Sequence, residues 1–511
     1  MSQVAAGRWR LVLSGLSVLA VLVMYVFLVS LGRWTYWPET SRYYDDLAAA
    51  FQSGQLNLDI EAPPALLALS NPYEPSARNS VPETRKSVDE VWDLSFYNGK
   101  FYLYWGPVPA LLLLVTRVGY PGPIPDQYLV FGFAVGLFFF EVLLLFKLHR
   151  SLFPKVPNTL FLMSVVLAGL AFPIPVLLSR AAVYEATILG GQFFLLGGLY
   201  IAARAVEKDK VSRPLMILAV MFWGLAAGSR TIALIPATFL TFVLIYWGLR
   251  KAGRTRGPFQ VALFCLQIGW PLVLTLIATA WYNWARFGSI FETGLRYTLT
   301  FHNLQKFYGE TFSAAYVLPS LWTYLLSGFD IARRFPFLVI GYGHSPSLLF
   351  IGQSSIYHFE EVTGLILSSP IVLFSLISLW KTGSLLLEKH RKRQLERFDE
   401  QGDERLLWIS VSLVGAASLS FGAILFYFNV SMRFLGELAP ALMLFTTLGV
   451  WEGYQFAARS NFGRRLYVSF VFCLFLVTIG LSILLAMSAN YRMFHHHNPG
   501  LIKQLVQFFG T

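Results

Sequence analysis

The sequence predicts an all-α polytopic membrane protein, and three observations support that fold class. Of the 511 residues, 56% are hydrophobic and only 13% are charged, whereas charged residues make up about 25% of a soluble domain. Several apolar runs are as long as a helix needs to cross a hydrocarbon core about 30 Å thick. Many of the 40 basic residues gather in short segments between these runs, which is the pattern of cytoplasmic loops.

The apolar runs predict about eleven membrane-spanning helices, with the N-terminus in the cytoplasm and the C-terminus outside. The first run, 11–31, is too long for the core of a signal peptide and lacks a clear cleavage site, so we interpret it as a retained span. Residues 214–249 form one apolar stretch interrupted at Gly228, Ser229 and Arg230, and basic clusters at both ends favour two short helices. The other spans are expected near 128–147, 159–178, 186–203, 259–281, 363–380, 406–427, 438–456 and 466–487.

Two long outer loops are predicted, at 32–127 and 282–362. In the first loop, Asn98 and Gly99 stand between alternating aromatic and polar residues, which indicates a small β-hairpin with a type I′ turn. The apolar segment 107–120 is short for a membrane crossing and contains prolines. Because a crossing there would place the next basic cluster outside, we expect a helix that lies along the outer surface.

The net charge of +12 does not indicate a nucleic-acid partner, because its basic residues lie in the short cytoplasmic segments. One of these segments, 381–405, is expected to be a charged cytoplasmic linker, either solvated chain or helix, within a single membrane domain that covers 1–511. Cys265 and Cys473 fall inside apolar runs, so no disulfide framework is indicated. The partner that the composition predicts is the lipid bilayer, and the expected location is the cell membrane.

Single arginines beside single acids mark the predicted outer ends of the spans. Ionisable groups at that depth are expensive and often functional, and an array of planar guanidiniums suits a phosphate or diphosphate. Each arginine could equally form a helix-end salt bridge or extend its charge to the membrane surface, which leaves both interpretations open. The candidates for donor phosphate binding are Arg180, Arg230, Arg286, Arg296 and Arg433, and the neighbouring substrate-binding candidates are Tyr184, Glu185 and Glu437. The pairs expected from sequence are Arg180 with Glu185, Arg286 and Arg296 with Glu292, and Arg433 with Glu437.

Acids in the first outer loop supply the other half of a possible sugar-transfer site. Direct displacement needs one carboxylate that takes a proton from the acceptor hydroxyl, and cations that stabilise the departing phosphate. Asp45 and Asp46 point about 100° apart if they lie on a helix, so only one can face a given site. The candidate bases are Glu39, Asp45, Asp46 and Asp93, and each could instead be a solvated helix charge or a turn hydrogen-bond acceptor. Tyr97, Lys100 and Tyr104 are candidates for contacts to a sugar, although such aromatics also form interfacial belts.

Known nucleotide and metal motifs are absent from the sequence. It contains no phosphate-binding glycine loop of the Walker or dinucleotide type, no His-Glu-x-x-His and no Cys/His spacing typical of a metal site. The run His495, His496 and His497 near the C-terminus is interpreted as part of a solvated tail. No cofactor is therefore predicted from the residues, and a divalent ion stays open.

The chain resembles the GT-C superfamily of integral-membrane glycosyltransferases, which includes protein O-mannosyltransferases and lipid A aminoarabinose transferases. The resemblance is strongest at 43–58, where Tyr-Tyr-x-x-Leu-Ala-x-x-Phe-x-x-Gly-Gln-Leu is similar to the helix after the first span. It continues at 92–109, 180–185, 224–230 and 282–297. The chain also resembles bacterial membrane proteins that share Arg-Phe-Gly and Met-Arg-Phe stretches. The resemblance implies a GT-C-like helical bundle.

The resemblance further implies an inverting transfer of a hexose or pentose from a polyprenyl-phosphate donor to an acceptor outside the membrane. The acceptor can be a glycan, a lipid or a protein, and some members of the superfamily use a divalent ion. The superfamily usually carries an Asp-Glu pair before the position of Gly54, and this sequence has Glu39 flanked by Pro38 and Thr40 there instead. Two alternatives therefore stay open: a non-catalytic membrane scaffold with a similar fold, and a lipid or solute transporter.

Overall fold

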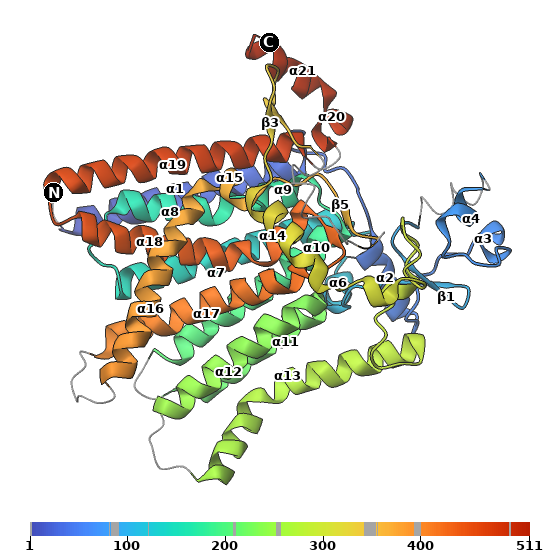
Figure 1. The fold of residues 1–511 in the computed structure, drawn as a ribbon, viewed down its shortest axis with the longest axis horizontal. Helices are drawn as coiled ribbons and strands as arrows, with labels where there is room; N and C mark the ends of the chain where they lie inside the picture. Colours follow the sequence, from blue (N-terminus) through green and yellow to red (C-terminus); the bar gives the residue numbers. More distant parts are fainter. Residues whose placement is uncertain are drawn as a thin grey trace.

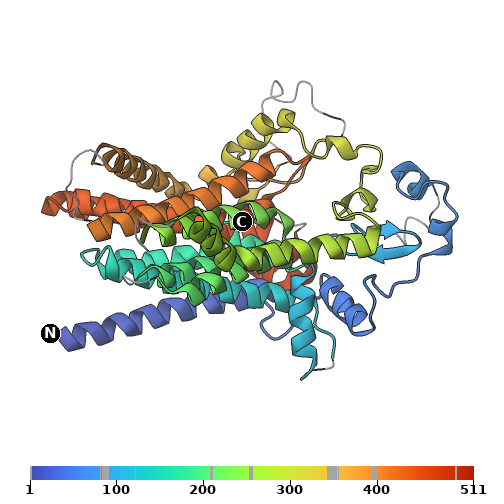
Figure 2. The same ribbon diagram turned by 90° about the horizontal axis from the view of Figure 1, so that it is seen from below.

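The computed structural model describes residues 3–80, 82, 91–120, 122–207, 211–251, 257–341, 354, 356–392, 400–489 and 492–510. Long helices run side by side through the molecule, and the segments between them gather in a layer at one end, which we term the loop end (Figure 1). The N-terminus lies at the opposite end from this layer in both views (Figure 2).

Nine helical segments among the described residues are long and apolar enough to cross a membrane, which agrees with the predicted polytopic helical class. The helices that form them are α1 (Gln3–Val29), α7 (Asp126–Ser151), α8 (Asn158–Leu170) with α9 (Ile174–Ser179), α10 (Val183–Ala205), α12 (Leu234–Lys251), α13 (Pro258–Phe287), α16 (Ser375–Lys392), α17 (Glu400–Leu425) and α19 (Asn461–Ser488).

Two further helices lie in the bundle without belonging to those nine segments. They are α11 (Arg213–Ser229), which is shorter, and α18 (Ala439–Ala457). The predicted total of about eleven spans therefore stays a prediction. The break predicted in the apolar stretch 214–249 is present, because α11 ends at Ser229 and a short 3-10 helix, η1 (Thr231–Ala233), precedes α12.

Helix ends follow the local sequence. α13 begins at Pro258, where the missing N–H and fixed φ of proline suit the first turn of a helix. It ends before Gly288, whose φ of +72° is a left-handed conformation that glycine adopts without strain. At the loop end, Gly106 lies against the end of α11, and a Cβ added to it would stand 2.0 Å from the carbonyl oxygen of Gly228. Only glycine allows this close approach.

The loop layer contains the predicted hairpin. Strands β1 (Ser95–Tyr97) and β2 (Lys100–Tyr102) pair antiparallel, and Asn98 and Gly99 both have positive φ, as a type I′ turn requires. The layer also holds α2 (Tyr43–Gln52), α3 (Pro64–Leu67), α4 (Pro75–Asn79), α6 (Val108–Arg117), η2 (Leu295–Tyr297), η3 (Tyr308–Glu310), η4 (Ala314–Tyr316), α14 (Val317–Leu326), α15 (Leu365–Ser368), η6 (Pro370–Phe374), η7 (Met432–Glu437), α20 (Met493–His497) and α21 (Pro499–Phe508). Helix α6 occupies the segment predicted as a surface helix, and its placement on a membrane surface stays a prediction.

Two short pairings complete the layer. Strands β3 (Asp330–Ile331) and β4 (Leu338–Val339) pair antiparallel, and β5 (His358–Phe359) pairs parallel with β6 (Asn429–Val430). The second pairing joins the second predicted loop to the segment after α17. It thereby brings residues about seventy positions apart to one place.

One predicted boundary differs in the structure. Helix α13 continues through 282–287, which was predicted as loop, and extends toward the hairpin (Figure 2). The extension is stabilised by aromatic packing, because the ring of Phe287 lies 5.6 Å from that of Tyr97 and 5.3 Å from that of Tyr102. The charged segment 381–405 is largely helical where it is described, since it includes the end of α16 and the start of α17. Its residues 393–399 lie outside the described residues.

Candidate functional site

A cavity of about 730 Å³ lies at the loop end between α10, α12 and α17. Most of its lining is apolar, and we term it the apolar cavity. Its charged side chains are Asp93, Arg230 and Arg433. The other lining residues are Tyr104, Trp105, Gly106, Tyr184, Thr231, Ile232, Leu234, Ile235, Thr293, Leu295, Thr298, Thr300, Leu304, Tyr308, Phe312, Ala423, Ile424, Phe426, Tyr427, Phe428, Asn429 and Phe434.

A second cavity, of about 540 Å³, adjoins the first and has a polar lining, so we term it the polar cavity. Six residues line both cavities: Asp93, Tyr184, Thr300, Phe428, Asn429 and Arg433. The polar cavity is otherwise lined by Trp92, Arg180, Phe301, His302, His358, Glu360, Glu361, Ser431 and Met432. Asp93 is the only acid among the six shared residues.

Asp93 is held by the backbone of the second loop. Its N–H donates to the Leu299 carbonyl at 3.1 Å, and Leu299 returns a bond to the Leu94 carbonyl at 3.0 Å. Its φ of +63° is a left-handed conformation, which Asp adopts more readily than most residues. The Tyr184 hydroxyl donates to the Asp93 carboxylate. The side chain is thus fixed between α10 and the 298–300 segment.

Burial raises the pKa of Asp93 above its ordinary value. The Tyr184 hydroxyl, the positive charge of Arg433 and a hydrogen bond with Thr300 oppose this rise. A carboxylate with a raised pKa that keeps hydrogen-bond donors beside it is suited to accept a proton, because general bases act best when their pKa approaches the working pH.

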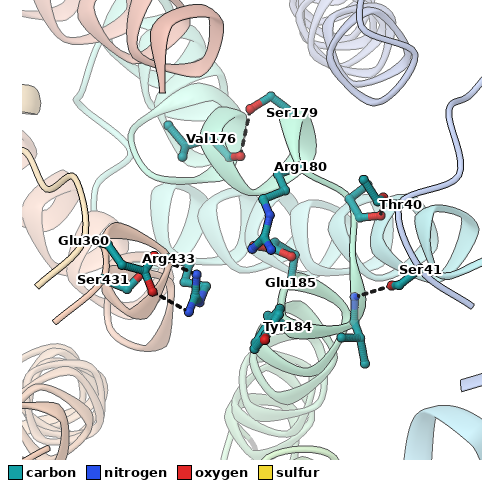
Figure 3. Close-up of polar contacts among 12 residues, drawn as sticks. Thr40, Ser41, Val176, Ser179, Arg180, Tyr184, Glu185, Glu360, Ser431 and Arg433 are labelled. Carbon is teal, nitrogen blue, oxygen red and sulfur yellow. Dashed lines mark hydrogen bonds and ion pairs between the residues drawn. The ribbon is translucent and has the colours of Figure 1, made fainter. Parts of the chain in front are cut away.

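Arg433 forms a bidentate ion pair with Glu360. Its Nη1 donates to Oε2 at 2.9 Å and its Nη2 donates to Oε1 at 2.8 Å (Figure 3). Glu360 also accepts from Asn429 at 3.2 Å and from Ser431 at 2.9 Å. Although burial alone would raise it, the pKa of Glu360 is lowered by Arg433 and these two donors. The pairing predicted between Arg433 and Glu437 is therefore wrong, because the β5–β6 pairing brings Glu360 to Arg433 instead.

Glu437 pairs with Arg230, which stands between α11 and η1. The Arg230 Nε donates to the Glu437 carboxylate at 2.6 Å, and its Nη1 donates to the Thr187 hydroxyl at 3.3 Å. The guanidinium also lies 5.5 Å from the ring centre of Phe434. A guanidinium has five N–H donors, so these contacts leave Arg230 able to bind a further anion in the apolar cavity.

The turn between α9 and α10 carries Arg180 into the polar cavity. Arg180 pairs with Glu185 at 3.3 Å, which confirms the pair predicted from sequence, and its guanidinium lies 5.2 Å from the ring centre of Tyr184. The chain after α1 supports this turn. The Thr40 hydroxyl donates to the Ala181 carbonyl at 2.5 Å, and the Ser41 hydroxyl accepts from the Val183 N–H at 2.8 Å (Figure 3).

Comparisons with known proteins find similar solved structures. The archaeal oligosaccharyltransferase AglB from Archaeoglobus fulgidus, solved with an inhibitory peptide and a dolichol-phosphate, is 12% identical, with a TM-score of 0.45 over 94% of this chain and 56% of its own. ArnT from Cupriavidus metallidurans, solved bound to undecaprenyl phosphate, is 12% identical, with a TM-score of 0.41 over 95% of this chain and 77% of its own. The chain thus spans just over half the length of the archaeal enzyme. No family model and no curated protein matches it.

Several predicted site residues lie away from both cavities. Asp45 pairs with Arg117 at 2.7 Å, and Asp46 pairs with Arg42 at 3.3 Å on its own helix. Glu39 lines a different cavity. Of the four candidate bases, only Asp93 lines the apolar and polar cavities.

Two of the five candidate arginines also lie elsewhere. Arg286 is buried and donates to the Leu103 carbonyl at 2.6 Å and to the Asn283 side chain at 2.9 Å. Because Leu103 directly follows β2, Arg286 joins α13 to the hairpin. Its predicted pairing with Glu292 is not among the ion pairs of the described residues, whereas Arg296 does pair with Glu292, at 3.4 Å.

Some of the substrate-binding candidates line a cavity, and others lie elsewhere. Tyr104 and Tyr184 line the apolar cavity, whereas Tyr97 packs against Phe287 and Lys100 is exposed on β2. Sequence reasoning missed Glu360 and Thr300, which stand in the second loop without a recognisable motif. Among the described residues, no group of three or more His, Cys, Asp or Glu side chains is placed to hold a metal ion.

Proposed function

We propose that this protein is a membrane glycosyltransferase that moves a sugar from a polyprenyl-phosphate donor to an acceptor on the outer face of the cell membrane. The observation that carries the proposal is the position of Asp93, the one acid among the described residues that lines both the apolar and the polar cavity. A base that lines two adjoining cavities can reach a lipid-borne donor in one and a hydroxyl-bearing acceptor in the other.

The apolar cavity suits the donor. Its rim carries exposed apolar side chains, including Ile235, Phe312 and Phe426, which fit a hydrocarbon chain. Its inner end carries Arg230, whose remaining N–H groups suit a phosphate. A lipid tail at the rim and a phosphate beside Arg230 would direct the attached sugar toward Asp93.

The polar cavity suits the acceptor. Arg180, Glu360 and Glu361 offer hydrogen-bond donors and acceptors. The rings of Trp92 and Phe301 pack edge to face with centres 4.5 Å apart, which gives the cavity an aromatic wall. A polyhydroxylated group on a glycan, a lipid or a protein fits this lining.

The chemistry follows as a direct displacement. Asp93 takes the proton of the acceptor hydroxyl while that oxygen attacks the anomeric carbon of the donor sugar. The bond from the anomeric carbon to the phosphate oxygen breaks on the opposite face, and its electron pair leaves with the polyprenyl phosphate. Arg230 stabilises the charge that gathers on this phosphate. Tyr184 holds the Asp93 carboxylate in position, and the product has inverted configuration.

The test compares Asp93→Asn with Asp45→Asn in the full chain, reconstituted in liposomes. The substrates are a panel of undecaprenyl-phosphate sugars carrying a radiolabel, and membranes of the source cells supply the acceptors. We expect Asp93→Asn to lower label transfer at least about 100-fold, the usual contribution of a general base. Asp45→Asn removes a carboxylate outside both cavities and should stay within about threefold of the unaltered protein.

Transfer at the unaltered rate by Asp93→Asn would overturn the assignment of the base. An unaltered protein that binds undecaprenyl phosphate but transfers none of the sugars would instead support the scaffold alternative.

A further inference from the structure

A third cavity, of about 520 Å³, lies beside the outer segment of the chain that links α1 to α2. It shares no residue with the apolar or the polar cavity. Its lining consists of Tyr36, Trp37, Glu39, Tyr120, Pro123, Ile124, Pro125, Gln127 and Tyr128. We term it the aromatic cavity. It contains Glu39, an acid that the proposed reaction does not use.

Aromatic packing builds this cavity. The ring of Trp37 stacks on that of Tyr128 with centres 5.2 Å apart and meets the edge of Phe131 at 4.9 Å. Gln127, which is buried, donates its Nε2 to the Trp37 carbonyl at 3.3 Å. Its Oε1 has no hydrogen-bond partner among the described residues. A stacked aromatic pair and a buried amide thus border the cavity.

The chemistry of the lining selects a cation. Glu39 is an exposed carboxylate, and none of the described residues that line the cavity is Lys, Arg or His. Faces of Trp and Tyr attract ammonium groups, and a carboxylate adds charge and accepts hydrogen bonds. An anionic ligand would meet an acid without a compensating cation.

We propose that the aromatic cavity binds a primary ammonium group. A primary ammonium carries three N–H donors, which suit Glu39, whereas a quaternary ammonium has none. The cavity lies next to the first residues of α7, an apolar helix long enough to span a membrane, so a lipid headgroup such as ethanolamine can reach it. A free amine is the other source of the same chemistry.

The aromatic cavity is connected to the candidate active site by the residues that follow Glu39. Thr40 follows Glu39 and donates to the Ala181 carbonyl, and Ser41 accepts from Val183 (Figure 3). These bonds hold the turn that carries Arg180 and Tyr184. The binding proposal itself does not depend on the proposed function.

The experiment is native mass spectrometry of the full chain in detergent with short-chain phosphatidylethanolamine and phosphatidylcholine at equal concentrations. We expect the ethanolamine lipid to be favoured by about fivefold, and Glu39→Gln to abolish that preference. Glu61→Gln, which neutralises another exposed acid of the same loop, should retain it. Tyr128→Leu should weaken the preference without changing charge, and melting temperatures check that each variant is folded.

Adding free ethanolamine distinguishes a lipid headgroup from a free amine as the ligand. Displacement of the lipid by ethanolamine supports a site that needs only the amine, and retention of the lipid supports recognition of the whole headgroup. An unaltered protein without any preference between the two lipids, or a Glu39→Gln variant that keeps the preference, would overturn the proposal.

Discussion

Neutralising Glu360 provides the sharpest test of the ion pair between Arg433 and Glu360. Glu360→Gln removes the carboxylate that receives two hydrogen bonds from Arg433, whose side chain is only 10% exposed, while that of Glu360 is 22% exposed. Loss of one partner of a fully buried pair costs about 3–5 kcal/mol. Because Glu360 keeps some contact with solvent, we expect about 2 kcal/mol.

The assay is thermal unfolding of the full chain in detergent. Glu361→Gln is the matched control, because Glu361 lines the same cavity but forms no ion pair within the described part of the chain. The double variant Glu360→Gln with Arg433→Gln removes both charges, so it should melt above Glu360→Gln alone. A double variant that melts below both single variants by the sum of their losses would refute the reasoning.

Three further predictions concern Asp93 and Arg286. Because the pKa of Asp93 is raised above 3.8, the rate of transfer should fall on the acid side at a pH above that value. This fall should be absent from the pH profile of Asp93→Asn. The same raised pKa means that the folded state favours protonated Asp93. The stability that this preference contributes is present at low pH and is lost as pH rises through the folded-state pKa. Asp93→Asn should therefore raise the melting temperature at neutral pH more than at acid pH. Arg286→Lys, which cannot reproduce the bonds to Leu103 and Asn283, should destabilise by about 2 kcal/mol, whereas Arg296→Lys should change little in the same melting assay.

Local signals in the sequence predicted local structure well. Asn98 and Gly99 determine their own turn through positive φ, so the hairpin was predictable from two residues. The apolar runs predicted the helical class for the same reason, since a span needs only its own length and composition. The end of α13 was not predictable in this way, because Phe287 is held by rings of the distant hairpin.

The candidate site depended on contacts between distant segments. Four acids were equal candidates in sequence, and Asp93 is distinguished by Tyr184, Thr300 and Arg433, each far from it along the chain. Glu360 could not be paired with Arg433 from sequence, because the short β5–β6 pairing that joins them has no recognisable pattern.

The wall shared by the apolar and polar cavities has a kinetic consequence. Because Asp93 lines both cavities, the proposed transfer does not require one substrate to depart before the other enters. A transfer of this kind proceeds through a ternary complex, and initial rates measured against both substrates should give intersecting double-reciprocal lines. Parallel lines would indicate instead that the sugar rests on the protein between two half-reactions.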